Sequence, residues 1–142
     1  MVTILDQSNR YFDMTTLTKM NKLINDLADA PFKYGKADCY IFVAKLVKEW
    51  HGIDHIKTHD VYKNKKQAEE YMAKHGGIEA LITGMFGYSC LPEKCKNGDI
   101  VTAFTPEGDV AVGFVFDGNG LFKGKQVAKI PLCDCRLGWR IN

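Results

Sequence analysis

Residues 31–50 read PFKYGKADCYIFVAKLVKEW. From residue 39 onward the apolar side chains recur at the spacing of one helical face, which predicts an amphipathic helix over residues 39–51. Asp38 is a good N-cap for this helix, because its carboxylate can accept a hydrogen bond from a backbone N–H of the first turn. Gly52 is a natural C-terminal stop. The helix therefore begins on a cysteine, Cys39.

The rest of the chain places helices first and strands second. Helical spacing predicts helices over residues 15–29, 39–51, 66–75 and 78–83. After an Asn-Gly-Asp turn, short alternating runs predict strands over residues 100–104, 110–116, 121–122, 126–130 and 139–141. This order favours an α+β fold, with N-terminal helices packed on a C-terminal antiparallel sheet. We expect an N-terminal arm over residues 1–12. Because no linker divides the rest of the chain, we expect a single domain over residues 13–142.

Composition excludes several classes of protein. The chain has 142 residues, the usual size of one domain. Its net charge of +2 gives no basis for electrostatic nucleic-acid binding. No apolar run reaches the roughly 20 residues of a membrane span. The first ten residues lack the basic and apolar regions of a secretory signal, so we expect the protein to be made and folded in a reducing cytosol.

Cys39 is placed where a thiol can do chemistry. The N-terminus of a helix carries partial positive charge and unpaired N–H groups, which favour a thiolate and can hold an oxyanion. A thiolate at this position could attack a carbonyl carbon. A small buried core residue is the competing interpretation, because free cysteines are commonly buried.

Three segments together resemble the NlpC-type cysteine peptidases, which have a papain-like fold. They are the aromatic-x-Gly and Asp-Cys motif of residues 32–39, the Gly-Asp-Ile-Val run of residues 98–101, and the strand of residues 110–118. From about residue 31 to its end, the chain resembles a small phage-encoded branch of this superfamily, a branch without an assigned function. The shared features include Gly76-Gly77 and Trp139-Arg140. The resemblance implies a papain-like architecture.

The resemblance also implies that a catalytic residue is missing. It makes Cys39 the nucleophile, or its remnant, and Asp38 the helix cap. The histidine that deprotonates the thiol in the peptidases aligns with Ala111. A lost general base typically costs about 10²–10⁴ in rate, which favours a scaffold that has lost catalysis.

Other residues could replace the missing base. His51 ends the Cys39 helix, about 18 Å from the thiol by helical rise, which is beyond hydrogen-bonding reach. His55 and His59 lie in a predicted loop that could fold back, and Asp109 precedes the strand of residues 110–116. A carboxylate is a poor proton acceptor from a thiol at neutral pH.

The four remaining cysteines form two close pairs, Cys90 with Cys95 and Cys133 with Cys135. Four thiolates on adjacent loops could bind Zn²⁺ or an iron–sulfur cluster. Independent thiols and a disulfide are the alternatives, and a Cys-x-Cys pair is too close for a mutual bridge, so a disulfide between the pairs is the more favourable geometry.

Three functions follow from these observations. The first is a phage virion component of the tail tip or hub, made in the host cytoplasm, which contacts other tail proteins and requires no cofactor. The second is an active hydrolase of peptidoglycan peptides that uses Cys39. The third is a metal-binding accessory protein that uses the four distal cysteines.

Overall fold

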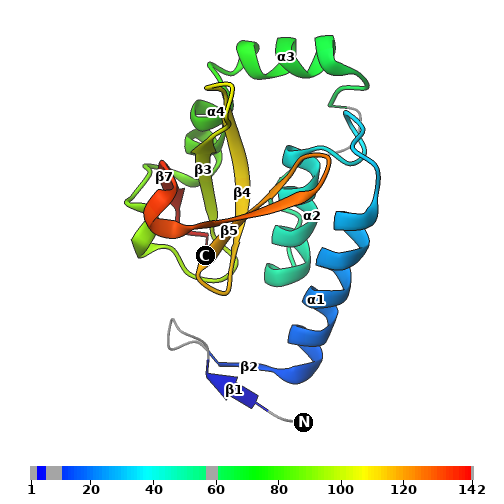
Figure 1. The fold of residues 1–142 in the computed structure, drawn as a ribbon. Helices are drawn as coiled ribbons and strands as arrows, with labels where there is room; N and C mark the ends of the chain where they lie inside the picture. Colours follow the sequence, from blue (N-terminus) through cyan, green and yellow to red (C-terminus); the bar gives the residue numbers. More distant parts are fainter. Residues whose placement is uncertain (1–2, 6–10, 57–60, 142) are drawn as a thin grey trace.

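A computed structural model describes residues 3–5, 11–56 and 61–141 of the chain. Within these ranges the helices are α1 (Met14–Asp29), α2 (Cys39–His51), α3 (Lys65–Lys74) and α4 (Ile78–Phe86). A five-stranded antiparallel sheet follows them in sequence, and α2 and α4 pack against it (Figure 1). The predicted α+β class is therefore confirmed.

The sheet has the strand order β6-β5-β4-β3-β7. Its strands are β3 (Ile100–Phe104), β4 (Val110–Phe116), β5 (Asn119–Lys123), β6 (Val127–Pro131) and β7 (Leu137–Trp139). Two short 3-10 helices, η1 (Pro92–Lys94) and η2 (Leu132–Asp134), accompany them. In the segment expected as an arm, β1 (Thr3–Leu5) and β2 (Tyr11–Asp13) form a separate antiparallel pair at the N-terminal end of α1 (Figure 1).

Several element boundaries differ from prediction, and two of the differences have a visible cause. Helix α4 continues to Phe86 and ends at Gly87, whose φ of 92° a helix cannot continue. The strand predicted over residues 139–141 is displaced, because β7 ends at Trp139 where it was expected to begin. The backbone N–H of Ile141 donates to the buried carboxylate of Asp99 at 2.9 Å instead of continuing the ladder.

Helix α2 lies between α1 and the sheet (Figure 1). Its buried side chains, among them Phe42 and Leu46, pack in one cluster with Val112 and Phe114 of β4. Residues of a strand alternate between the two faces of the sheet, so the intervening residues of β4 point away from α2. Accordingly Val115 belongs to a second cluster, on the far face.

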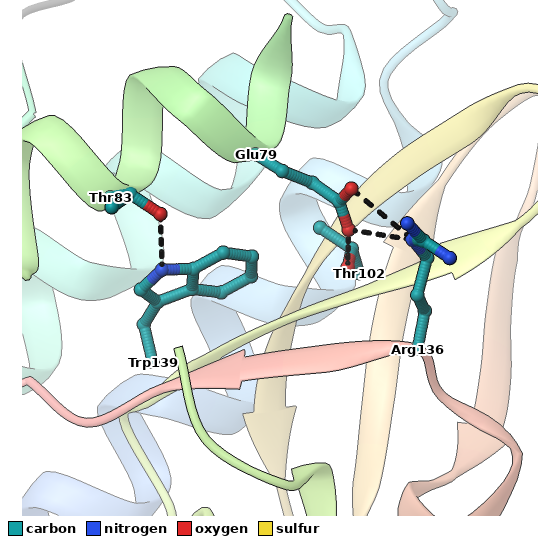
Figure 2. A network of polar contacts seen from close by, with 5 residues as sticks. All are labelled: Glu79, Thr83, Thr102, Arg136 and Trp139. Carbon is teal, nitrogen blue, oxygen red and sulfur yellow. Dashed lines mark hydrogen bonds and ion pairs between the residues drawn. The ribbon is translucent and has the colours of Figure 1, made fainter. Parts of the chain in front are cut away.

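Polar contacts fix α4 against the sheet (Figure 2). The indole Nε1 of the fully buried Trp139 donates to Thr83 Oγ1 at 3.1 Å. The carboxylate of Glu79 accepts a hydrogen bond of 2.8 Å from the buried hydroxyl of Thr102 and pairs with Arg136 Nε at 3.1 Å. One helix is thus tied to both β3 and β7.

A lysine from the sheet completes the C-terminus of α1. The last turn of α1 contains no basic residue. Lys123 of β5 is buried and donates from Nζ to the carbonyl oxygens of Ala28 at 3.1 Å and Ala30 at 2.5 Å. A cation is favourable at this end of a helix, and it satisfies carbonyls that would otherwise lack partners.

No helix in the described ranges has both the length and the apolar character that crossing a membrane requires.

Glu79→Ala tests the α4 contacts. The substitution leaves the fully buried Thr102 hydroxyl without its acceptor, so we expect a loss of about 1–3 kcal/mol in the free energy of unfolding, measured in urea. Lys22→Ala is the matched control. It removes an exposed ion pair with Asp26 within α1 and should cost far less than Glu79→Ala, because water screens exposed ion pairs. Equal losses in the two variants would contradict a structural role for Glu79.

Candidate functional site

Asp38 fixes the start of α2. Its side chain is 2% exposed, and its Oδ1 accepts a hydrogen bond of 2.9 Å from the backbone N–H of Ile41, as an N-cap does. Oδ2 accepts a second hydrogen bond, of 2.8 Å, from the N–H of Gly35. The hydroxyl of Tyr62 is a third partner of this carboxylate. The expected helix cap is confirmed, and it is joined to the preceding loop and to the segment after α2.

Gly35 lets this loop approach Tyr62. Its φ is +84°, a conformation that side chains with a Cβ rarely adopt. A Cβ at position 35 would also lie 2.2 Å from the carbonyl oxygen of Tyr62. Close backbone contact here thus brings the Tyr62 hydroxyl to Asp38. No pattern in the sequence links Tyr62 to Asp38, and sequence reasoning missed this residue.

Cys39 is the first residue of α2, as predicted, and packs against the core beside β4. Burial raises the pKa of its thiol to about 11, and the neighbouring carboxylate of Asp38 acts in the same direction. Hydrogen bonds from the backbone N–H groups of Val112, Tyr40 and Cys39 itself lower the pKa, but by less. The thiol is therefore protonated at neutral pH. The helix terminus was expected to favour a thiolate, and burial outweighs it.

A cavity of about 570 Å³ opens beside Cys39. Side chains of the 31–38 loop, α2, α3, α4 and the start of β4 line it: Phe32, Tyr34, Asp38, Cys39, Tyr40, Tyr62, Lys65, Ala68, Glu69, Met72, Ile78, Asp109 and Val110. The walls are thus largely aromatic and apolar, with both signs of charge at their edge. Such a surface can bind a ligand that has apolar and polar parts.

The described histidines lie elsewhere. His51 Nε2 is 2.8 Å from the carbonyl oxygen of Gly98, at the opposite end of α2 from Cys39. His55 packs its ring against His51 and Phe86, and His75 Nδ1 contacts the carbonyl oxygen of Tyr71. Among the described residues, no imidazole lines the Cys39 cavity. His59, the other candidate base, lies outside the described residues.

Ala111 does not face Cys39. It packs in the cluster on the far face of the sheet, together with Val115 and Ala103. Its neighbours Val110 and Val112 are the residues of β4 that approach the thiol, Val110 in the cavity wall and Val112 through its backbone N–H. A histidine at position 111 would therefore point away from Cys39. Asp109, the carboxylate proposed as a base, does lie in the cavity wall.

The four distal cysteines are all free thiols. Cys95 is buried with its sulfur beside Cys90, whereas Cys133 is exposed and Cys135 contacts the carbonyl oxygens of Ile130 and Pro131. Within the described residues, no three His, Cys, Asp or Glu side chains converge as metal ligands would. The geometry thus supplies no support for the predicted Zn²⁺ or iron–sulfur site.

Comparison with known proteins assigns the chain to a family. Residues 15–141 match the family described as a domain of unknown function (DUF6950), and the chain belongs to that family. No curated protein and no solved structure matches the chain. The match spans α1 to β7, so the loop with Asp38, the helix with Cys39 and the whole sheet lie within the family's domain.

Alkylation tests the state of the Cys39 thiol. Only the thiolate reacts, and with a pKa of about 11 its fraction at pH 7.5 is roughly 300-fold below that of free cysteine, so we expect iodoacetamide to modify Cys39 roughly 10²–10³-fold more slowly than free cysteine. Because the pKa is raised to about 11, the rate should keep rising with pH through the range in which free cysteine has already reached its plateau. Peptide mass spectrometry follows each thiol. Modification of Cys39 faster than free cysteine at pH 7.5 would refute a protonated thiol.

Asp38→Ala tests the buried cap. It removes the acceptor of two backbone N–H groups and of the Tyr62 hydroxyl, so we expect a loss of about 2–4 kcal/mol in the free energy of unfolding. Asn64→Ala removes the N-cap of α3, whose side chain accepts an exposed hydrogen bond of 2.9 Å from the backbone N–H of Gln67, and should cost about 0.5–1 kcal/mol. Urea unfolding compares the two. A smaller loss for Asp38→Ala than for Asn64→Ala would contradict the role given to Asp38.

Proposed function

We propose that this chain is a non-hydrolytic component of a phage tail tip or hub, built on a papain-like, NlpC-type scaffold. The non-hydrolytic part is supported chiefly by one observation. The pKa of Cys39 is raised to about 11, and no described imidazole lines its cavity. A nucleophile of this kind requires a thiolate and a base to form it. The assignment to a phage particle is supported by the sequence resemblance.

The order of helices and strands agrees with this proposal. In the proposed scaffold a cysteine starts a helix that packs against an antiparallel sheet. Here Cys39 starts α2, and α2 packs against β4. The strand beside the thiol presents valine where a catalytic site would need a proton acceptor. An aromatic cavity that no described imidazole lines suits binding better than bond cleavage.

Assembly of virions tests the proposal. In a phage whose genome encodes this chain, we expect mass spectrometry to find it in purified particles. A Cys39→Ala allele should give the wild-type titre, because the thiol performs no chemistry. Absence of the chain from particles would refute a virion role. Loss of infectivity in Cys39→Ala, with normal incorporation of the folded variant, would refute a role without catalysis.

The same cavity gives a specific reason to keep an active hydrolase of peptidoglycan peptides as a second candidate. Backbone N–H groups of Tyr40 and Cys39 reach the sulfur, and an oxyanion formed at this helix terminus would use similar donors. The cavity of about 570 Å³ is large enough for part of a peptide. The second candidate requires a base that the described residues do not supply.

Digestion of cell walls separates the two candidates. We expect purified chain to release no more soluble peptide from peptidoglycan than Cys39→Ala does. Release that depends on Cys39 would establish the hydrolase, and His59→Ala would then ask whether His59 is its base. Val110→His is the informative gain-of-function variant, since position 110 lines the cavity, and Ala111→His is its matched control on the opposite face.

The N-terminal pair of strands is the proposed contact with neighbouring tail proteins. β1 and β2 pair with each other at the end of α1 and lie apart from the five-stranded sheet (Figure 1). A two-stranded pair can extend by adding a strand from another chain. We expect a chain that starts at residue 13 to retain its circular dichroism spectrum and to be missing from assembled particles. Normal incorporation of this truncated chain would contradict such a contact.

A further inference from the structure

We propose that Cys90 and Cys95 are a redox-active dithiol that a low-molecular-weight disulfide oxidises to an intramolecular disulfide. This inference goes beyond the proposed function, because it concerns the opposite side of the sheet from Cys39. It rests on the way in which a backbone bridge and a glycine bring the two sulfur atoms together.

A β-bridge fixes the position of Cys90. Its N–H donates to the carbonyl oxygen of Gly138 at 2.7 Å, and its carbonyl oxygen accepts from the N–H of Gly138 at 2.9 Å. Two residues that exchange both hydrogen bonds face each other across an antiparallel pair, with Cα atoms about 5.5 Å apart. The side chain of Cys90 therefore stands next to the place where residue 138 would carry one.

The sulfur of Cys95 fills that place. A Cβ at Gly138 would lie 2.4 Å from Cys95 Sγ, so the glycine makes room for the thiol. The 3-10 helix η1 provides the reversal between the two cysteines, and its end is closed by a hydrogen bond of 2.9 Å from Cys95 N to Pro92 O. The two thiols lie within hydrogen-bonding reach of each other. A disulfide requires such a close approach of sulfur atoms.

The two cysteines differ in access. Cys95 is 7% exposed, and Cys90 is partly exposed between Tyr88 and Leu91, which are 96% and 64% exposed. Burial raises the pKa of the Cys95 thiol above its usual range. Cys90 is thus the thiol that an oxidant in solution reaches first, and Cys95 is the thiol that closes the bond.

The reaction proceeds by two thiol–disulfide exchanges. The Cys90 thiolate attacks one sulfur of the oxidant RSSR, which forms a mixed disulfide and releases RS⁻. Cys95 then loses its proton to solvent, and its sulfur attacks Cys90 Sγ and releases the second RS⁻. The two released thiolates take up the two protons. The protein dithiol is oxidised by two electrons, and RSSR is reduced to two RSH.

Peptide mapping after treatment with oxidised glutathione tests the proposal. Trypsin cuts between Lys94 and Cys95, so a Cys90–Cys95 bond leaves the peptides 75–94 and 95–96 joined until a reductant separates them. We expect this linked species in the intact protein after the remaining thiols have been blocked with iodoacetamide. Cys133→Ser, which changes an exposed cysteine, should leave its yield unchanged.

Variants establish the order of steps. Cys95→Ala should accumulate the glutathione adduct on Cys90. In the wild-type chain this adduct should be converted to the Cys90–Cys95 disulfide. Three results would overturn the proposal. They are a stable glutathione adduct on Cys90 in the wild-type chain, a link from Cys90 or Cys95 to Cys133 or Cys135, and unmodified Cys90 at a glutathione concentration that modifies Cys133. The wild-type mapping holds even if Cys95→Ala fails to fold.

Discussion

One buried carboxylate, that of Asp38, determines both where α2 begins and how Cys39 is presented. It accepts hydrogen bonds from Ile41 and Gly35 and from the hydroxyl of Tyr62, so three segments of the chain meet at one group. Placing such a carboxylate in the interior is costly unless its acceptor positions are filled, and here they are. The same negative charge lies beside the thiol and opposes its ionisation. The group that fixes the start of the helix therefore adds to the effect of burial, which is the main cause of the raised pKa of the thiol.

The helix terminus and burial act on Cys39 in opposite directions. Backbone N–H groups at the start of α2 and from Val112 stabilise a thiolate, and desolvation favours the neutral thiol by more. A histidine in contact with the sulfur would shift this balance by accepting the proton. The strand that faces the thiol instead presents the side chain of Val110 and the backbone N–H of Val112, and neither can accept the proton of the thiol. What remains is a partly aromatic cavity with a protonated thiol in its wall.

Local signals in the sequence were sufficient for much of the fold. Helix α2 begins after Asp38 and ends before Gly52, as predicted, because a side-chain cap and a left-handed glycine act within a few residues. Strand β7 was misplaced since its end depends on Asp99, which lies 42 residues from Ile141 in the chain. Alignment to a family motif selected Ala111, although the alternation of Val112 and Phe114 along β4 already indicates that Ala111 faces the other way. The contact of Tyr62 with Asp38 and the burial that sets the thiol pKa arise only from the folded chain.

The protonation state of Cys39 is therefore the property to measure directly. Cysteine labelled with ¹³C at Cβ reports ionisation of each thiol through its chemical shift, and Cys39→Ala identifies the resonance. A resonance that stays in the thiol range at pH 7 and titrates near pH 11 agrees with a site built for contact. A Cys39 resonance in the thiolate range at pH 7 would show an activated nucleophile and would contradict the non-hydrolytic role.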